Sequence, residues 1–267
     1  MQLIETIQQK KSFLCVGLDS DPNLLPPHLA GKENAIFEFN RAIIDATAPY
    51  AVAYKPNTAF YEAEGAAGWE QLEATVAYIK TNYPECFVIA DAKRGDIGNT
   101  AQRYARAFFE RMDCDAVTLA PYMGKDSIAP FLAYENKYAI VLALTSNPSA
   151  VELETRILND GTPLYEQVIR QCLGYEGSQR IMFVVGATRP EKLADIRALA
   201  PDSFFLVPGV GAQGGTVEEV AKYGLNAQCG LLVNSSRGII FASKGEDFAE
   251  EAGRQARMLA EKMAAYL

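Results

Sequence analysis

Eight short apolar runs, separated by stretches with the periodicity of amphipathic helices, constrain the fold of this sequence more than any other feature. Such runs are typical of strands that are buried on both faces of a parallel sheet. Eight strand-helix units in 267 residues match a (β/α)8 TIM barrel in number and size. An open doubly wound sheet is the alternative, but no G-x-G-x-x-G sequence follows the first run to support it. The runs are residues 13–19, 51–57, 86–93, 116–121, 139–146, 181–188, 204–209 and 230–236, with helical patterns for example at 34–47, 69–82, 162–175 and 248–266.

The composition is that of an ordinary globular protein, with 49% hydrophobic and 22% charged residues. No internal repeat, low-complexity segment or linker rich in Gly, Pro or Ser divides the sequence, so we expect one domain over residues 1–267. The formal net charge of -8 argues against a general nucleic-acid or acidic-membrane partner, because both attract an excess of Lys and Arg. No apolar run approaches membrane-spanning length, and residues 1–11 lack the apolar core of a leader. We therefore expect a cytoplasmic protein.

The cysteines and the histidine carry little chemistry in this sequence. The five cysteines are scattered, lie mostly within apolar runs and form no C-x-x-C pair, so we expect reduced core residues. The only histidine, His28, lies in a loop with turn signals and is expected at the surface. A single histidine argues against histidine-based acid–base catalysis and against a histidine-rich metal site. Proton transfer would therefore fall to Lys or Asp.

The third apolar run ends abruptly in four ionisable residues, Asp91, Lys93, Arg94 and Asp96. Because side chains alternate along a strand, Asp91 and Lys93 are expected on the same side of it. Asp96 precedes a helical pattern, and a helix N-terminus favours a nearby carboxylate. A surface ion pair together with a helix-capping aspartate would explain each residue singly, but not the grouping at the end of a buried strand. We therefore interpret this group as a candidate catalytic site.

Most of the other apolar runs also end in polar residues or glycine. In a (β/α)8 barrel the carboxyl ends of the strands are where the active site lies, so this pattern strengthens the barrel prediction. The residues concerned are Asp19, Lys55, Asn57, Ser146, Thr188, Gly209 and Ser235.

Two connections have unusual sequences. Residues 147–161 form a long strand-to-helix connection, which is either a lid over the barrel mouth or a tolerated surface insertion with a short helix; length alone favours the insertion.

Residues 208–216, PGVGAQGGT, contain four glycines that would let backbone N–H groups approach a ligand. Loops after the seventh and eighth strands of such barrels commonly bind phosphate, and Arg237 can hold a phosphate bidentately. An exposed Arg237 paired with an acidic neighbour is the alternative, but the adjacent glycine loop favours phosphate.

With these motifs in this order, the chain resembles the orotidine 5′-phosphate decarboxylase family, in its longer bacterial-type form. The resemblance covers about residues 13–240 and implies a (β/α)8 barrel that converts orotidine 5′-monophosphate to uridine 5′-monophosphate and CO2, the last step of de novo UMP biosynthesis. It also implies that no metal or organic cofactor takes part, and that the protein is a homodimer with shared active sites. The motifs are DAKRGDIGNT (91–100), TSNP (145–148), PGVGAQGG (208–215) and SSRG (235–238), together with Asp19 and Lys55.

The resemblance implies a role for each matching residue. Lys55, Asp91, Lys93 and Asp96 would form an alternating charged array, in which Lys93 donates the proton to C6 of the pyrimidine and Asp96 reaches the neighbouring subunit's site. The residues implied to bind substrate are Asp19 and Lys55 at the ribose hydroxyls, Thr100 beside Asp96, Ser146 at the pyrimidine amide edge, Pro208 in the base pocket, Gln213 between base and phosphate, and Ser236 and Arg237 at the phosphate.

Two other functions compete with this one. A metal-assisted sugar-phosphate aldolase or decarboxylase of the same barrel superfamily also has a D-x-K-x-x-D strand end. The metal-using members of that superfamily, however, resemble each other in having a Glu metal ligand after the second strand and a His later in the barrel. Here Lys55 follows the second strand, and the only histidine, His28, precedes that strand. A barrel that binds a nucleotide phosphate without chemistry would leave the charged array without a role.

Overall fold

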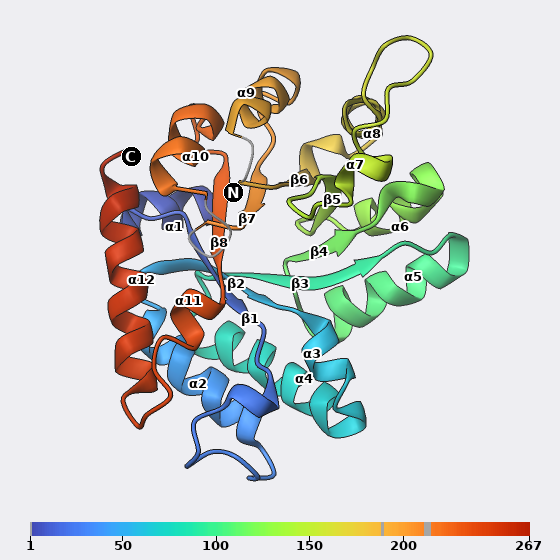
Figure 1. The fold of residues 1–267 in the computed structure, drawn as a ribbon. Coiled ribbons are helices and arrows are strands. Elements are labelled where there is room, and N and C mark those ends of the chain that lie inside the picture. The colour runs from blue at the N-terminus through green and yellow to red at the C-terminus, as the bar shows by residue number, and fades with distance from the viewer. Residues whose placement is uncertain (1, 188–189, 211–214) are drawn as a thin grey trace. The chain divides into compact units, whose positions relative to one another are not determined.

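The computed structural model describes residues 2–187, 190–210 and 215–267. Its strands are parallel where their registers are given, they hydrogen-bond in chain order, and the order closes into a barrel, which confirms the predicted (β/α)8 fold (Figure 1). Each strand begins within one residue of its predicted apolar run. The strands are β1 (Leu14–Leu18), β2 (Ala51–Pro56), β3 (Phe87–Arg94), β4 (Ala116–Leu119), β5 (Tyr138–Leu144), β6 (Ile181–Val185), β7 (Phe205–Pro208) and β8 (Leu231–Ser235).

Helices occupy the connections between strands, as the sequence pattern predicts. The four named helical patterns correspond to α2, α4, α8 and α12. The helices are α1 (Gln2–Lys10), α2 (Ala35–Thr47), α3 (Thr58–Glu62), α4 (Gly65–Asn82), α5 (Gly98–Arg106), α6 (Ala129–Leu132), α7 (Ala150–Leu153), α8 (Leu164–Leu173), α9 (Pro190–Leu199), α10 (Val217–Gly224), α11 (Arg237–Ile240) and α12 (Phe248–Ala264), with 3-10 helices η1 (Pro22–Leu24), η3 (Pro121–Ser127) and η4 (Ser178–Arg180) and a π-helical turn η2 (Ala107–Arg111).

The residues group into two compact units, and each is described by itself. Unit 1 holds β1, β2, most of β3 and the C-terminal helices α11 and α12. Unit 2 holds β4 to β7 and most of β8. The prediction of one domain over residues 1–267 stays a prediction. Unit 1 comprises Met1–Ala92, Met112–Cys114 and Asn234–Leu267, and unit 2 comprises Lys93–Arg111 and Asp115–Val233.

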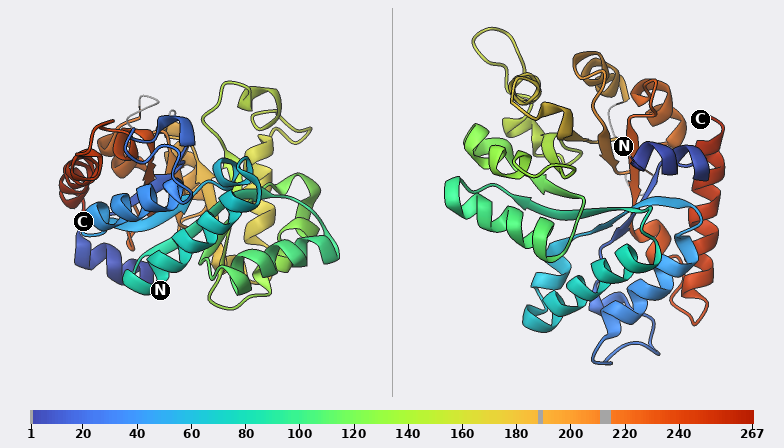
Figure 2. Two further views of the ribbon diagram at one scale, coloured as in Figure 1. Left: turned by 90° about the horizontal axis from the view of Figure 1, so that it is seen from below. Right: turned by 180° about the vertical axis from the view of Figure 1, so that it is seen from behind.

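In unit 1, helices α12, α2 and α4 pack side by side (Figures 1 and 2). The ring of Phe39 on α2 joins the first two, because it stacks on Phe241 at 5.4 Å and on Phe248 at 5.2 Å between ring centroids. Phe39 is fully buried. Offset aromatic pairs of this kind add about 0.5–1.5 kcal/mol beyond the area they bury. The aromatic cluster therefore fastens the C-terminal helix to the core of unit 1.

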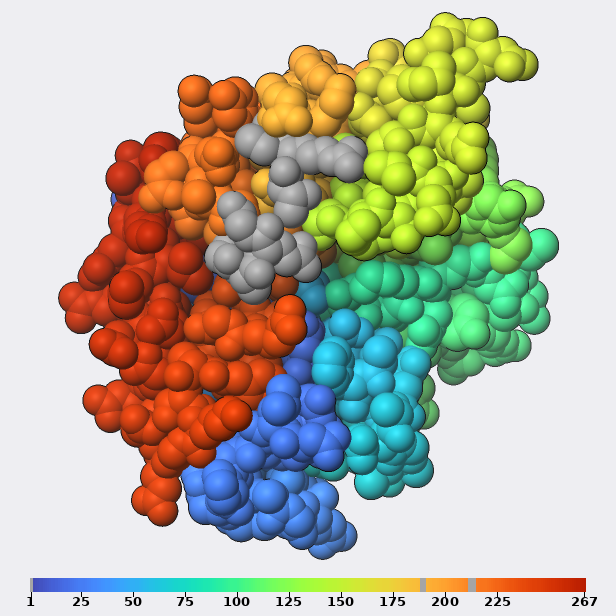
Figure 3. Space-filling model, in the orientation of Figure 1, coloured from blue at the N-terminus to red at the C-terminus, as the bar shows by residue number. Residues whose placement is uncertain are grey.

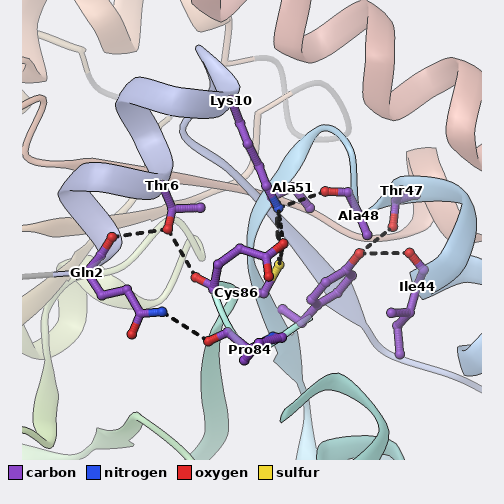
Figure 4. Close-up of polar contacts among 11 residues, drawn as sticks. Gln2, Thr6, Lys10, Ile44, Thr47, Ala48, Ala51, Pro84 and Cys86 are labelled. Carbon is purple, nitrogen blue, oxygen red and sulfur yellow. Dashed lines mark hydrogen bonds and ion pairs between the residues drawn. The ribbon is translucent and has the colours of Figure 1, made fainter. Parts of the chain in front are cut away.

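Polar contacts fasten the N-terminal helix α1 to the start of β2 and to the residues before β3 (Figure 4). The ammonium group of Lys10 donates to the carbonyl oxygens of Ala48 at 2.8 Å and Ala51 at 3.0 Å, and it pairs with Glu85 at 3.1 Å. The Thr6 hydroxyl donates to the Glu85 carbonyl at 3.1 Å. These contacts give hydrogen-bond donors to backbone carbonyls at the junction of α1, β2 and β3.

A buried arginine organises the amino-terminal ends of β7 and β8 in unit 2. Arg197 on α9 is 9% exposed, and its guanidinium carbon lies 3.8 Å from the centre of the Phe205 ring. Burial lowers the pKa of Arg197 to about 10, so the side chain is charged at neutral pH. The accepting carbonyl oxygens, at 2.6–3.3 Å, belong to Ala200, Pro201, Ser203, Gly224 and Gly230.

The cysteines, the histidine and the helices agree with what the sequence predicts of them. All five cysteines are buried and none forms a disulfide, as predicted for reduced core residues. His28 is exposed, as expected. Among the described residues, no helix combines the length and apolar character that crossing a membrane requires. The cytoplasmic location stays a prediction.

Candidate active site

Three of the predicted site residues come together in unit 1, at the ends of β1, β2 and β3. The ammonium group of Lys55 lies 2.7 Å from Asp91 Oδ2 and 3.9 Å from Asp19 Oδ1. The sequence places them together because each follows an apolar strand, and parallel strands end at the same edge. Asn57 forms a bridge to Asp91, which extends the pairing of β2 and β3 to this point.

The electrostatics of this cluster keep Lys55 charged. Lys55 is 4% exposed, and burial alone would lower its pKa. The carboxylates of Asp91 and Asp19 outweigh burial, and the pKa of Lys55 is raised above its ordinary value. Asp19 Oδ1 is buried, and no hydrogen-bond donor in the described part of the chain reaches it. Buried carboxylate oxygens are normally hydrogen-bonded, so Asp19 can accept a bond from a ligand.

The end of β8 lies against β1 in unit 1, and only a glycine fits between them. A Cβ atom on Gly17 would stand 1.9 Å from Ser236 Oγ and 3.1 Å from Asn234 Oδ1. Both oxygens are buried and have no hydrogen-bond partner among the described residues. Arg237 follows directly and is exposed. The predicted phosphate residues Ser236 and Arg237 therefore have polar atoms available for a ligand.

Lys93, in unit 2, has an unusual backbone conformation. Its φ is 46°, in the left-handed region that residues other than glycine seldom adopt. Its backbone N–H donates to the hydroxyl of Thr118 at 2.9 Å, while Arg94 lies over the rings of Tyr104 and Phe108 at 5.1 and 5.6 Å. Non-glycine residues held this way cost about 1–3 kcal/mol and cluster at functional sites. The expectation that Lys93 lies on the same side of the strand as Asp91 stays a prediction.

The residues after β3 are accessible. Asp96 is half-buried, and its carboxylate accepts a bond from the N–H of Ile97 at 2.8 Å. Ile97 is 47% exposed, and Thr100 in the first turn of α5 is exposed as well. Helix α5 begins at Gly98, whose φ of 55° suits a residue without a side chain. Both candidate residues are therefore open to a partner or ligand.

In unit 2, the residues that follow β6 contact both Ser146 and Pro208. A Cβ atom on Gly186 would stand 2.9 Å from Ser146, so the chain after β6 packs directly on that residue. The next N–H, of Ala187, donates to the Pro208 carbonyl at 3.1 Å. Ser146 and Pro208 are both half-buried. Gln213 lies outside the described residues.

The connection after β5 contains a short helix, α7, as expected for a surface insertion. Glu154 anchors it, because its carboxylate accepts bonds from the backbone N–H and the hydroxyl of Thr145 at 2.7 and 2.8 Å. The segment between α7 and α8 stands out from unit 2 (Figure 3). Ile157 in this segment is 65% exposed. A lid function for residues 147–161 stays a prediction.

The described residues contain no group of three or more His, Cys, Asp or Glu that could hold a metal ion.

A model of the orotidine 5′-phosphate decarboxylase / HUMPS family matches residues 12–252. The chain belongs to this family. It is 60% identical over 263 residues to orotidine 5′-phosphate decarboxylase of Flavobacterium johnsoniae, covering 98% of this chain and 96% of that protein. It is 56% identical to the enzyme of Phocaeicola vulgatus, with the same coverage. The solved structure of Leishmania donovani OMP decarboxylase has a TM-score of 0.85 at 36% identity and covers 100% of this chain and 99% of that one.

Sequence reasoning about this decarboxylase-family chain did not single out Asn234, Gly17 or the strained backbone of Lys93. One signal was available for Asn234, which is a polar residue inside the eighth apolar run. Gly17 interrupts the first run in the same way. The conformation of Lys93 has no sequence signal, because lysine gives no local reason to adopt a positive φ.

Proposed function

We propose that this chain catalyses the decarboxylation of orotidine 5′-monophosphate to uridine 5′-monophosphate and CO2, without a metal or organic cofactor. Membership of the decarboxylase family over residues 12–252 is the observation that carries this proposal. The charged residues at the ends of β2 and β3 supply the groups that the chemistry needs. The reaction would be the last step of UMP biosynthesis.

The proposed reaction has a high barrier because loss of CO2 from C6 leaves a vinyl carbanion with no adjacent carbonyl to accept the charge. A fixed ammonium group can stabilise that charge as it develops and then deliver a proton. We assign both tasks to Lys93. Asp91, Lys55 and Asp96 complete the charged array. The bond of 2.7 Å between Lys55 and Asp91 supports the presence of such fixed charges in unit 1.

The remaining site residues are proposed to bind the nucleotide. The buried Asp19 Oδ1, which has no donor among the described residues, suits a ribose hydroxyl, and the raised pKa of Lys55 keeps a charged donor beside it. The buried hydroxyl of Ser236 and the exposed fork of Arg237 suit a phosphate. Binding energy from the distant phosphate can then be used at the reacting carbon. Thr100, Ser146, Pro208 and Gln213 keep the roles that the family resemblance implies.

The direct test is the fall in ultraviolet absorbance when purified protein meets orotidine 5′-monophosphate, measured with and without a metal chelator. We expect rapid loss of absorbance, equal in both arms, and formation of uridine 5′-monophosphate by chromatography. Loss that occurs only with added metal would favour the metal-assisted relatives. Tight nucleotide binding without any loss would favour a binding protein.

We also propose a homodimer with shared sites. Large apolar side chains are exposed after β3 and β4 in unit 2: Ile97 at 47%, Tyr122 at 85% and Met123 at 49%. Contiguous exposed apolar patches commonly mark an interface, and the proposal is that these side chains contribute to one. Asp96 is next to Ile97 in sequence, so a partner that covers Ile97 would approach Asp96.

Mixing two inactive variants tests the shared site. Asp96→Ala and Lys93→Ala chains are each expected to be inactive, whereas a mixed dimer would contain one intact site. Random mixing of equal amounts should therefore restore about a quarter of the wild-type activity, as expected for a two-fold symmetric dimer. The measurement is turnover after joint refolding, with each variant refolded alone as the control. No recovery in a sample shown to contain mixed dimers would contradict the shared site.

A further inference from the structure

A buried hydrogen-bond network surrounds the end of β1 in unit 1. Its centre is Asn40 on α2, which is fully buried, as are Ser20, Tyr61 and Thr75. The Ser20 hydroxyl donates to Asn40 Oδ1 at 2.6 Å. Asn40 Nδ2 donates to the Tyr61 hydroxyl at 2.9 Å and to the Thr75 hydroxyl at 3.0 Å. The network therefore joins the β1 loop to helices α2, α3 and α4.

The network meets the chain on both sides of Asp19. The Tyr61 hydroxyl donates to the Leu18 carbonyl at 3.1 Å, and Ser20 on the other side is held by Asn40. The carboxylate of Asp19 itself is not part of the network, because it faces Lys55 at 3.9 Å. The residues before and after the carboxylate are thus fixed to helices, while its buried Oδ1 atom has no hydrogen-bond donor among the described residues.

The network also connects two of the residues that carry charge. Tyr61 lies on α3, which follows β2 directly, and β2 carries Lys55. A shift of α3 relative to β1 would therefore change the distance between Lys55 and Asp19. Fully satisfied buried polar networks impose one geometry, because every alternative leaves a buried group without its partner.

We propose that Asn40 and Tyr61 are positioning residues, which hold Asp19 in the orientation that binds a ribose hydroxyl of the substrate. This inference rests on the proposed function. If the network were purely structural, substitutions in it would change only the stability of the fold. A positioning network changes recognition of the hydroxyl that Asp19 contacts, and its effect disappears when Asp19 can no longer make that contact.

A double-mutant cycle between Tyr61 and Asp19 separates these possibilities. Tyr61→Phe removes both the bond to the Leu18 carbonyl and the bond from Asn40, and it keeps the ring volume. We expect it to lower kcat/KM by roughly tenfold or more, since small displacements of binding groups have effects of this size. In an Asp19→Ala background, which has no acceptor for the ribose hydroxyl, the same change should alter kcat/KM by less than about twofold, because coupled residues are not additive. Equal effects in the two backgrounds, or no effect with Asp19 intact, would overturn the proposal.

Tyr54→Phe is the matched control. The Tyr54 hydroxyl is equally buried and also donates to a backbone carbonyl, that of Ile44, at 3.0 Å. It contacts α2 and not the β1 loop. We expect kcat/KM within about twofold of wild type, although the loss of the bonds to Ile44 and Thr47 lowers stability by about 1–2 kcal/mol. A fall equal to that of Tyr61→Phe would indicate a general effect of hydroxyl loss and would overturn the proposal.

Ser20→Ala provides a second route if Tyr61→Phe does not fold. It removes the donor to Asn40 Oδ1 next to Asp19, and the same non-additivity with Asp19→Ala is expected. If Asp19 binds the 2′-hydroxyl, kcat/KM for a 2′-deoxy substrate should be unaffected by Tyr61→Phe and Ser20→Ala. If Asp19 binds the 3′-hydroxyl, the same should hold for a 3′-deoxy substrate. An equal fall in kcat/KM for both deoxy substrates in the network variants would overturn the proposal. Turnover by the wild-type protein tests the proposed function separately. Wild-type turnover with an additive cycle would remove this inference and leave the function standing.

Discussion

Lys93→Ala should reduce the turnover of orotidine 5′-monophosphate by at least about 10⁴-fold, because one group provides both electrostatic stabilisation and the proton. The substitution keeps a Cβ atom, so the positive φ of this position is as strained as before and the backbone has no new freedom. Uridine 5′-monophosphate should still bind measurably, since the ribose and phosphate contacts belong to other residues. Turnover follows from product chromatography, and binding follows from calorimetry.

Lys192→Ala is the matched control for this experiment. Lys192 lies on α9 in the same unit, is 43% exposed in its side chain and forms a surface ion pair with Asp195. We expect wild-type turnover from this variant. Retained turnover in Lys93→Ala would contradict the assigned mechanism. Loss of both turnover and nucleotide binding would show that the residue serves binding rather than the chemical step.

Among the substitutions described here, Arg197→Met should lower the free energy of unfolding most, by at least about 3 kcal/mol. Methionine keeps an apolar stem over Phe205, but it removes the bonds of the guanidinium group. The carbonyl oxygens of Ala200, Pro201 and Gly230 keep a second donor. Those of Ser203 and Gly224 lose the donor that Arg197 supplies. Each buried acceptor without a partner costs about 1–3 kcal/mol, and relaxation recovers part of this. The free energy of unfolding of Arg197→Lys should lie between those of the wild type and Arg197→Met, because a single ammonium group cannot replace a five-donor fork.

Urea unfolding with a comparison of m-values is the measurement. Arg254→Met is the control, because Arg254 is an exposed arginine that pairs with Glu251 across one helical turn. No measurable change in stability is expected for it, as for most surface ion pairs. A stability of Arg197→Met equal to wild type would show that the carbonyl groups find other partners, and would remove the assigned role of this arginine.

The strands and their polar ends could be predicted because both follow from local chemistry. Continuous apolar runs indicate strands buried on both faces, and parallel strands end at one edge. The pairing of Lys55 with Asp91 and Asp19 follows from those two facts. The roles of Thr100, Ser146 and Gln213 came only from the family motifs, since nothing in their local sequence indicates a ligand.

Asn40 is a residue whose burial the sequence indicates but whose hydrogen-bond partners it does not. It lies on the buried face of α2, at the spacing of Ile36, Ile43 and Ile44, and a polar residue on an apolar stripe is a signal. The signal does not identify the partners, because Ser20, Tyr61 and Thr75 come from three other segments. A buried amide needs donors and acceptors from somewhere, but only the packing of α3 and α4 decides which residues supply them.

The sequence by itself determined the barrel, the charged strand ends and the family, because apolar periodicity and short motifs are local properties of the chain. Only the tertiary structure decided the left-handed backbone of Lys93, the carbonyl cluster around Arg197 and the network behind Asp19. Each of these depends on atoms that are distant in sequence: the Thr118 hydroxyl, carbonyl groups from several loops, and side chains on three helices. Hydrogen bonds over such distances form only once the apolar core has brought the segments together.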